Sequence, residues 1–196
     1  MKIKKKTQFL KEEIIDNRTY LFRGESKSNY HNRAKTTLNS RYYAFEAFDM
    51  IGIWGKVVIY ELSNNANILE YEESVEDFVN EYDLTSVKST LLKKLYGVNS
   101  LDELTDDRSY HDVYHARQII ATEYLETKTD YDGCIWYEWS DTPEYQIQIW
   151  NNSVVRKLPY KEAREVIDKL GEMYPEIYAK EDIEDFWNKR YFELKK

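Results

Sequence analysis

The stretch "TYLFRGES", residues 19–26, decides which fold the sequence predicts. The three apolar residues before Arg23 are typical of a short buried strand. An arginine is rarely buried without a partner, and the glycine that follows it, Gly24, would let another group approach the backbone closely. We therefore expect the end of this strand to hold a ligand. The alternative is a structural ion pair between Arg23 and an acidic side chain elsewhere.

The chain of 196 residues is large enough for one globular domain, and its content of 42% hydrophobic and 33% charged residues is that of a folded protein. Its formal net charge of −8 argues against nonspecific binding to nucleic acids. The charge is uneven, because residues 70–83 are strongly acidic whereas residues 23–41 carry five basic side chains and one acidic side chain. This basic loop favours a phosphate-bearing ligand nearby, or it is a solvated loop with scattered charges.

The sequence predicts a cytoplasmic protein. Its single cysteine, Cys134, excludes a disulfide within the chain and favours a reducing compartment. Residues 1–10 are basic but lack the apolar core of a signal peptide. No stretch of the sequence is apolar over the length that a transmembrane helix needs, so we expect no membrane partner.

Hydrophobic periodicity and turn residues predict an α+β protein. The expected elements of the first part are a short helix at 6–16, strands at 19–24 and 41–43, a helix from 44 to 52 or 55, and strands at 56–62 and 68–72. Helices follow at 74–83 and 86–97, with a longer one ending near 126, and then strands within 130–138, 143–151 and 153–158. The tail has the pattern of two amphipathic helices broken around Pro175.

The central helices carry two further signals. Ser74 is the expected N-cap of the first one, with Asp77 three residues later in the place of the capping-box acid. In the long helix the candidates for one face are Tyr110, Val113, Tyr114, Arg117, Ile120 and Tyr124. Because the chain shows no linker or repeat, we expect a single domain over residues 1–196. Its core motifs lie at about 19–62 and 129–157, with a helical insert at about 74–126 and a helical tail at about 160–194.

Glu144 opens a strand in which polar and apolar residues alternate. The alternation sets Tyr145, Ile147 and Ile149 on one side and Glu144, Gln146 and Gln148 on the other. This spacing favours a polar stripe that faces solvent. The alternative is a carboxylate placed at the lip of a cleft.

The aromatic residues Tyr42, Tyr43 and Trp54 also have two interpretations. Single aromatic residues are most often part of a core. They can equally form a platform on which a flat ligand stacks.

Taken in order, these pieces resemble the ADP-ribosyltransferase family, in the branch of the poly(ADP-ribose) polymerases and diphtheria-toxin-like enzymes. The resemblance consists of Phe22-Arg23-Gly24 at a strand end, Tyr42-Tyr43-Ala44 followed by Trp54-Gly55, and Glu144-Tyr145-Gln146-Ile147 opening a late strand. The turn "DYDG", residues 130–133, precedes that strand as in small members of the family. The resemblance covers residues 19–62 and 129–157 and implies a split antiparallel β-sheet, to which the helical insert and C-terminal helices are additions.

The chain departs from the polymerase pattern at Arg23, where those enzymes carry histidine. An arginine there resembles the Arg-Ser-Glu branch, but "KTTLNS", residues 35–40, matches that branch's Ser-Thr-Ser strand poorly, and Glu144-Tyr145-Gln146 lacks its second acid. The resemblance therefore implies a triad of Arg23, Tyr42 and Glu144. It also implies transfer of a single ADP-ribose unit rather than chain elongation.

The family uses NAD as a co-substrate, and the resemblance implies a role for each residue. Glu144 would hold the ribose 2′-hydroxyl and stabilise an oxocarbenium-like transition state. Gly24 would pair with the nicotinamide amide, and Arg23 would hold the ADP part. Tyr42 or Tyr43, together with Trp54, would sandwich the nicotinamide ring. Since adjacent strand residues point to opposite faces, only one of the two tyrosines can do so, and the family pattern favours Tyr42.

The resemblance leaves the acceptor open among proteins, RNA and DNA. Small cytoplasmic members of the family are often toxins of defence systems or phage effectors, which would add an antitoxin or inhibitor as a partner. Water as the acceptor would make the chain an NAD glycohydrolase. Loss of turnover would leave a catalytically inactive binding module.

The pair His111 and His115 raises one further alternative, a metal site. Histidines at i and i+4 share a helix face, as in the zinc motif His-Glu-x-x-His. Here Asp112 stands in the place of the glutamate, and His31 is the only other histidine. We therefore expect no metal cofactor and interpret the pair as polar residues on an exposed helix face.

Overall fold

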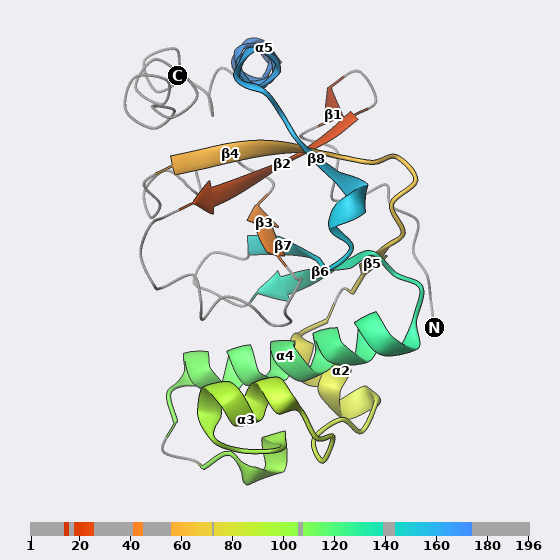
Figure 1. The fold of residues 1–196 in the computed structure, drawn as a ribbon, viewed down its shortest axis with the longest axis vertical. Helices are drawn as coiled ribbons and strands as arrows, with labels where there is room; N and C mark the ends of the chain where they lie inside the picture. Colours follow the sequence, from red (N-terminus) through yellow and green to blue (C-terminus); the bar gives the residue numbers. More distant parts are fainter. Residues whose placement is uncertain are drawn as a thin grey trace. The chain divides into compact units, whose positions relative to one another are not determined.

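The computed structural model describes residues 14–15, 18–25, 41–44, 56–71, 73–105, 108–138 and 144–173. These residues form an α+β protein, as the sequence predicts (Figure 1). They belong to two compact units. Unit 1 contains Arg41, Tyr42 and residues 67–152, and unit 2 contains residues 43–66, the strands before residue 27 and the chain from residue 153 onward.

Unit 2 is built on antiparallel strands, which are β1 (Ile14–Ile15), β2 (Arg18–Glu25), β4 (Lys56–Leu62) and β8 (Val155–Lys157). β2 pairs with β4 from Thr19, opposite Leu62, to Glu25, opposite Lys56. β1 pairs with β2, and β8 pairs with β4. β3 (Arg41–Ala44) also pairs antiparallel with β2. The strands predicted at 19–24, 41–43 and 56–62 are therefore confirmed.

Ile14 and Ile15 show that the helix predicted at 6–16 is wrong at its end. Ile14 pairs with Thr19 and Ile15 with Arg18 across neighbouring strands. Two adjacent β-branched residues fit a strand better than a helix. The pairing with β2 therefore outweighs the helical spacing of the apolar residues.

Unit 2 also contains the helix α5 (Tyr160–Met173), which follows the 3₁₀ turn η3 (Asn152–Val154) and β8. α5 buries residues at the i, i+3, i+4, i+7 spacing of a core-facing stripe, which are Ala163, Val166, Ile167 and Leu170. Arg156 of β8 forms ion pairs with Glu61 of β4 and, at 2.9 Å, with Glu162 of α5. The second helix predicted for the tail lies outside the described residues.

The sheet of unit 1 contains β5 (Ile68–Glu70), β6 (Gly133–Glu138) and β7 (Glu144–Ile149). β6 and β7 pair antiparallel over six residue pairs, from Gly133 opposite Ile149 to Glu138 opposite Glu144. β5 pairs parallel with β6, so the expected antiparallel sheet is corrected here to a mixed one. The reason is the chain path, because the helical segment between β5 and β6 is a crossover of the kind that parallel strands require.

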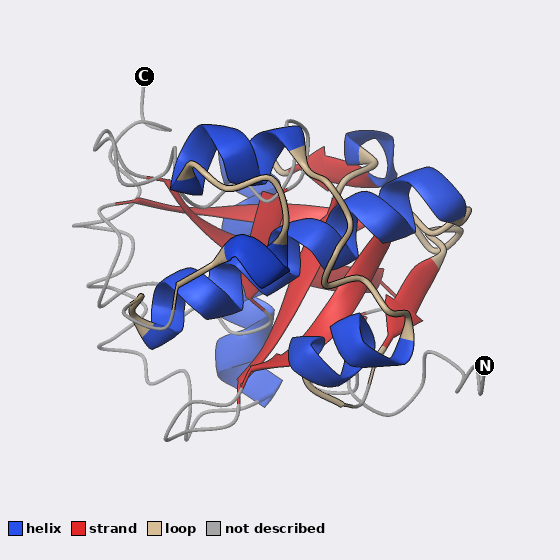
Figure 2. Ribbon diagram, turned by 90° about the horizontal axis from the view of Figure 1, so that it is seen from below, coloured by secondary structure: helices blue, strands red, loops and turns tan. Residues whose placement is uncertain are grey.

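Three helices of unit 1 lie where the sequence predicts helices. They are α2 (Val75–Glu81), α3 (Thr90–Tyr96) and α4 (Tyr110–Lys128), with a 3₁₀ turn η2 (Leu101–Glu103) before α4. Side chains of these helices pack with those of β5 and β6 in one hydrophobic core. Figure 2 shows the helices in blue and the strands in red. Among the described residues, no helix combines the length and the apolar character needed to cross a bilayer.

Helix caps explain where the first two helices begin. Ser74 and Asp77 form the predicted capping box at α2. α3 begins at Thr90 instead of near residue 86, because the hydroxyl of Ser89 accepts hydrogen bonds from the backbone of the next turn, at 3.1 Å from both Leu91 N and Leu92 N. Gly97 ends the helix in the left-handed conformation, at φ 77°.

The core of unit 1 centres on Phe78 of α2 and Trp136 of β6, whose ring centroids are 5.5 Å apart at an edge-to-face angle of 85°. The face that α4 buries contains Ala116, Ile119, Ile120, Ala121 and Leu125. Tyr110, predicted for the same face as Ile120, is 61% exposed and stacks on Tyr114 instead. Small and aliphatic residues in the middle of α4 make the closest packing, whereas Tyr110 near its start is exposed.

Candidate functional site

The predicted ligand-binding strand end is the last part of β2. Arg23 lies opposite Val58 of β4, and Gly24 lies opposite Val57. Phe22 is fully buried, whereas Arg23 is half-buried with its Nη1 atom closed off from solvent. A guanidinium at this boundary between core and surface is well suited to an anionic or hydroxyl-bearing group.

β3 carries the two predicted tyrosines next to this strand end. Ala44 pairs with Phe22 in antiparallel orientation. Because the strands are antiparallel, the residue after Phe22, which is Arg23, lies on the same side of this pair as the residue before Ala44, which is Tyr43. Arg23 and Tyr43 therefore each lie one residue from this pair, at the same end of neighbouring strands. Trp54 and the basic loop between these strands, residues 26–40, lie outside the described residues.

Glu144 is the first residue of β7, as predicted, and pairs with Glu138 at the end of β6. It belongs to unit 1, whereas Arg23, Gly24 and Tyr43 belong to unit 2. Tyr42, the tyrosine of the predicted triad, belongs to unit 1 together with Glu144. The side chain of Glu144 lies outside the described part of the chain.

The "DYDG" turn anchors the start of β6. The carboxylate of Asp132 accepts hydrogen bonds from the backbone nitrogen of Asn67, at 2.8 Å, and from Nδ2 of Asn151, at 2.6 Å. A Cβ atom on Gly133 would lie only 2.5 Å from the carbonyl oxygen of Gln148. The described contacts of this turn therefore hold β6 against β5 and β7.

The expectation that the polar residues of β7 face solvent is wrong at Gln148. This side chain is fully buried, and its Oε1 atom accepts hydrogen bonds from Oγ1 of Thr122, at 3.0 Å, and from Nε1 of Trp136, at 3.1 Å. The cause is α4, which carries Thr122 and covers this face of the strand. The sequence signals for the contact are weak, since they are a glutamine between two isoleucines and a threonine within an apolar helical run.

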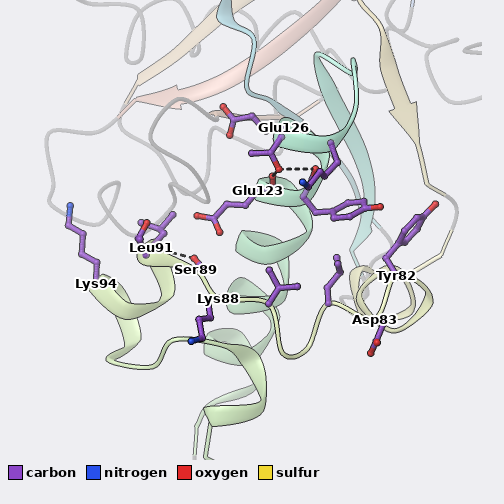
Figure 3. Close-up of a pocket in the computed structure, with 14 residues that line it drawn as sticks. Tyr82, Asp83, Lys88, Ser89, Leu91, Lys94, Glu123 and Glu126 are labelled. Carbon is purple, nitrogen blue, oxygen red and sulfur yellow. Dashed lines mark hydrogen bonds between the residues drawn. The ribbon is translucent and has the colours of Figure 1, made fainter.

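A pocket of about 940 Å³ lies in unit 1 between the end of α2, the start of α3 and the second half of α4 (Figure 3). Its apolar lining consists of Leu84, Val87, Leu91 and the rings of Tyr82 and Tyr124. Its charged lining consists of Lys88, Lys94, Lys128, Asp83, Glu123 and Glu126. Because these charges balance, electrostatics favour neither an anionic nor a cationic ligand. Sequence reasoning missed the pocket because three separate helices form it.

Glu123 is an acidic residue in the lining of this pocket. It projects from α4 toward the start of α3 (Figure 3). Burial raises the pKa of its carboxyl group, and a hydrogen bond from Ser89 opposes this shift.

His115 is not the exposed polar residue that the sequence predicts. It is half-buried, and its Nδ1 atom lies 2.7 Å from the hydroxyl oxygen of Tyr96. Burial lowers the pKa of the imidazole, and the nearby carboxylate of Asp112 opposes this shift. The side chain of His111 lies outside the described residues, as does His31. Within the described ranges, no three His, Cys, Asp or Glu side chains are grouped to hold a metal ion.

Comparisons with known protein families, with curated proteins and with solved structures found no match to this chain. The candidate site is therefore supported by the order of its motifs along the chain and by the pairing of the strands that carry them.

Proposed function

We propose that this protein is an NAD-dependent mono-ADP-ribosyltransferase with an ADP-ribosyltransferase-like fold. The supporting observation is the pairing of Ala44 on β3 with Phe22 on β2. Arg23-Gly24 directly follows Phe22 and Tyr42-Tyr43 directly precedes Ala44, and both are motifs of the resemblance. Glu144 opens the later strand β7, in the order that the family pattern requires.

The reaction breaks the bond between C1′ of the nicotinamide ribose and the nicotinamide nitrogen, and the electron pair of the bond leaves with nicotinamide. The ribose passes through an oxocarbenium-like transition state. The Glu144 carboxylate stabilises this positive charge and accepts a hydrogen bond from the 2′-hydroxyl. The acceptor then forms a bond to C1′ and gives up its proton, for which Glu144 is the candidate base.

The remaining residues bind NAD. Gly24 allows the backbone to pair with the nicotinamide amide, since a side chain there would obstruct the approach. Arg23 holds the ADP part through its planar guanidinium. Trp54 and one of the two tyrosines, Tyr42 in the family pattern, stack on the nicotinamide ring.

The acceptor is a macromolecule, either a protein or a nucleic acid. The resemblance suggests the context of a toxin in a defence system or a phage effector acting in the cytoplasm, with an antitoxin or inhibitor as its partner. If water is the acceptor, the same site makes the protein an NAD glycohydrolase.

The test is nicotinamide release from NAD by the wild-type protein, with and without cell lysate, total RNA or DNA. Glu144→Gln should lower the rate by roughly 10²–10³-fold, which is the usual effect of removing one preorganised electrostatic group. Glu138→Gln is the matched control, because Glu138 pairs with Glu144 across the sheet and loses the same charge. It should retain most of the rate.

The pattern of release distinguishes the alternatives. Release that needs one added fraction identifies a transferase and its acceptor class. Release without any addition identifies a glycohydrolase. The enzyme interpretation is wrong if neither release nor NAD binding occurs, and a binding module then becomes the better description.

A further inference from the structure

We infer that Gln148 is a positioning residue for Glu144, because its buried amide oxygen selects the register of β7. The inference rests on the function proposed above, in which Glu144 is the catalytic carboxylate. It adds to that function a residue that touches neither NAD nor the acceptor and acts through the strand.

Two donors from different elements converge on the side-chain oxygen of Gln148. Thr122 donates from the middle of α4, and Trp136 donates from β6. An amide oxygen has two lone pairs, so these two donors satisfy it. Both donor side chains are themselves fully buried. The oxygen therefore has one well-defined position relative to both the helix and the neighbouring strand.

The indole of Trp136 is held in place by its own neighbours. Its ring centroid lies 5.5 Å from that of Phe78 and 6.2 Å from that of Tyr71, and both contacts are edge-to-face. Because the ring cannot turn freely, its N–H points to one position on β7. The partner of Trp136 in the strand pairing is Gln146, so the hydrogen bond runs diagonally to Gln148.

The native register of β7 satisfies these donors, and a slip by one residue in either direction does not. A slip by one residue would bring Ile147 or Ile149 to the place of Gln148, and neither side chain can accept a hydrogen bond. The same slip would move the amide of Gln148 to the opposite face of the strand. Three buried donors or acceptors would then lack partners, which is costly in a water-excluded core.

The register of β7 determines the position of Glu144. Glu144 begins the strand, four residues before Gln148, which corresponds to roughly 13 Å in an extended chain. A slip by one residue would move it by about 3.3 Å and reverse its face. A misplacement of about 1 Å in an active site can already cost 10²-fold in rate. The contact at Gln148 can therefore control catalysis from a distance.

A purely structural role makes a different prediction. If Gln148 only stabilised the core, its loss would lower the folded fraction, while the molecules that remain folded would keep the wild-type kcat. A positioning role lowers kcat per folded molecule and leaves the KM for NAD nearly unchanged, because Arg23 and Gly24 lie on β2, which is not a neighbour of β7 in the sheet.

The test compares Gln148→Met, which keeps the shape but removes the acceptor, with Thr122→Val, which removes one donor. Thr122→Ser keeps the donor and serves as the conservative variant. Ile120→Val is the matched stability control, because Ile120 is buried in the same helix and makes no contact of this network. Nicotinamide release is measured at a temperature at which each variant is folded, and NMR contacts between β6 and β7 report the register.

The expected result is a fall in kcat of about 10- to 100-fold in Gln148→Met, with a KM for NAD within about 2-fold of wild type and a second set of β6–β7 contacts. The kcat of Thr122→Val should lie between that of Gln148→Met and that of the wild type. Thr122→Ser and Ile120→Val should keep the wild-type kcat. If Gln148→Met does not fold, Thr122→Val alone decides between a lowered and an unchanged kcat.

A wild-type kcat in these variants, or a lowered kcat with a single native register, overturns the inference. If the wild-type protein itself releases no nicotinamide, the proposed function fails, and the NMR register still gives an answer. A single native register in Gln148→Met then excludes a register role, whereas a second register supports it.

Discussion

Arg117 of α4 and Glu76 of α2 form a bidentate ion pair, with nitrogen-to-oxygen distances of 2.7 and 3.0 Å. The Arg117 side chain is 25% exposed and that of Glu76 is 52% exposed, so the pair lies at the rim of the core and not within it. This ion pair connects the two helices through charged side chains. A fork-shaped contact with two parallel hydrogen bonds is stronger than a single surface ion pair.

Removing this pair should weaken unit 1 measurably. We expect Arg117→Met to lower the free energy of unfolding by about 1 kcal/mol at low ionic strength, and by less in 1 M salt, where charges are screened within about 3 Å. Urea denaturation at both salt concentrations measures the difference. Arg164→Met is the control, because Arg164 reaches Asp168 only at 3.7 Å on an exposed face of α5. An equal effect of both variants would contradict the special role of the bidentate geometry.

Gly133 and Gly97 should differ in how they tolerate alanine. A Cβ on Gly133 would lie 2.5 Å from the backbone oxygen of Gln148 and 2.7 Å from Cδ1 of Ile149, so β6 and β7 would have to separate. We expect Gly133→Ala to destabilise by roughly 1–3 kcal/mol or more. Gly97→Ala meets open space and pays only for its φ of +77°, about 1 kcal/mol. Thermal unfolding of the two variants tests this order, and a larger loss at Gly97 would contradict it.

The strands and helices were predictable where the signal is local. The run at 56–62 is β-branched and apolar, and it forms β4 with the predicted bounds; Ser74 caps α2 through residues three positions away. Ile14 and Ile15 were not predictable as a strand, because their partner is β2 and not a neighbour in sequence. Alternation showed that Gln148 shares a face with other polar residues, but not that α4 would cover it.

His115 should make the stability depend on pH. Its folded-state pKa is lowered by burial below the usual 6.5, so the unfolded chain binds the proton more tightly. The free energy of unfolding should therefore fall as the pH drops below about 6.5, by at most about 1.4 kcal/mol per pH unit from this one group. Above that pH the contribution of His115 to the free energy of unfolding is constant. Asp112 opposes the shift. Arg108 lies over the ring of Tyr96, whose hydroxyl contacts His115.

The control for this pH dependence is His115→Gln, which removes the titration and can still bond to the hydroxyl of Tyr96. Urea denaturation of both proteins between pH 5 and 8 gives a difference curve in which the other two histidines cancel. The curve should be flat above pH 7 and should fall toward low pH. A difference that falls as the pH rises would show that the folded-state pKa is raised instead.

Arg23 gives the sharpest prediction about NAD binding. Its proposed contact is with the ADP part of NAD, away from the bond that breaks, so it stabilises bound NAD and the transition state alike. Arg23→Lys keeps the charge but loses the planar fork that matches phosphate oxygens. We therefore expect the KM for NAD to rise about 10-fold, which corresponds to about 1.4 kcal/mol, with little change in kcat.

Arg156→Lys is the control, since Arg156 lies in the same unit but pairs with Glu61 and Glu162 at the surface. A fall in kcat at constant KM would instead assign Arg23 to the transition state, and equal effects of both variants would show that Arg23 acts only through the stability of unit 2.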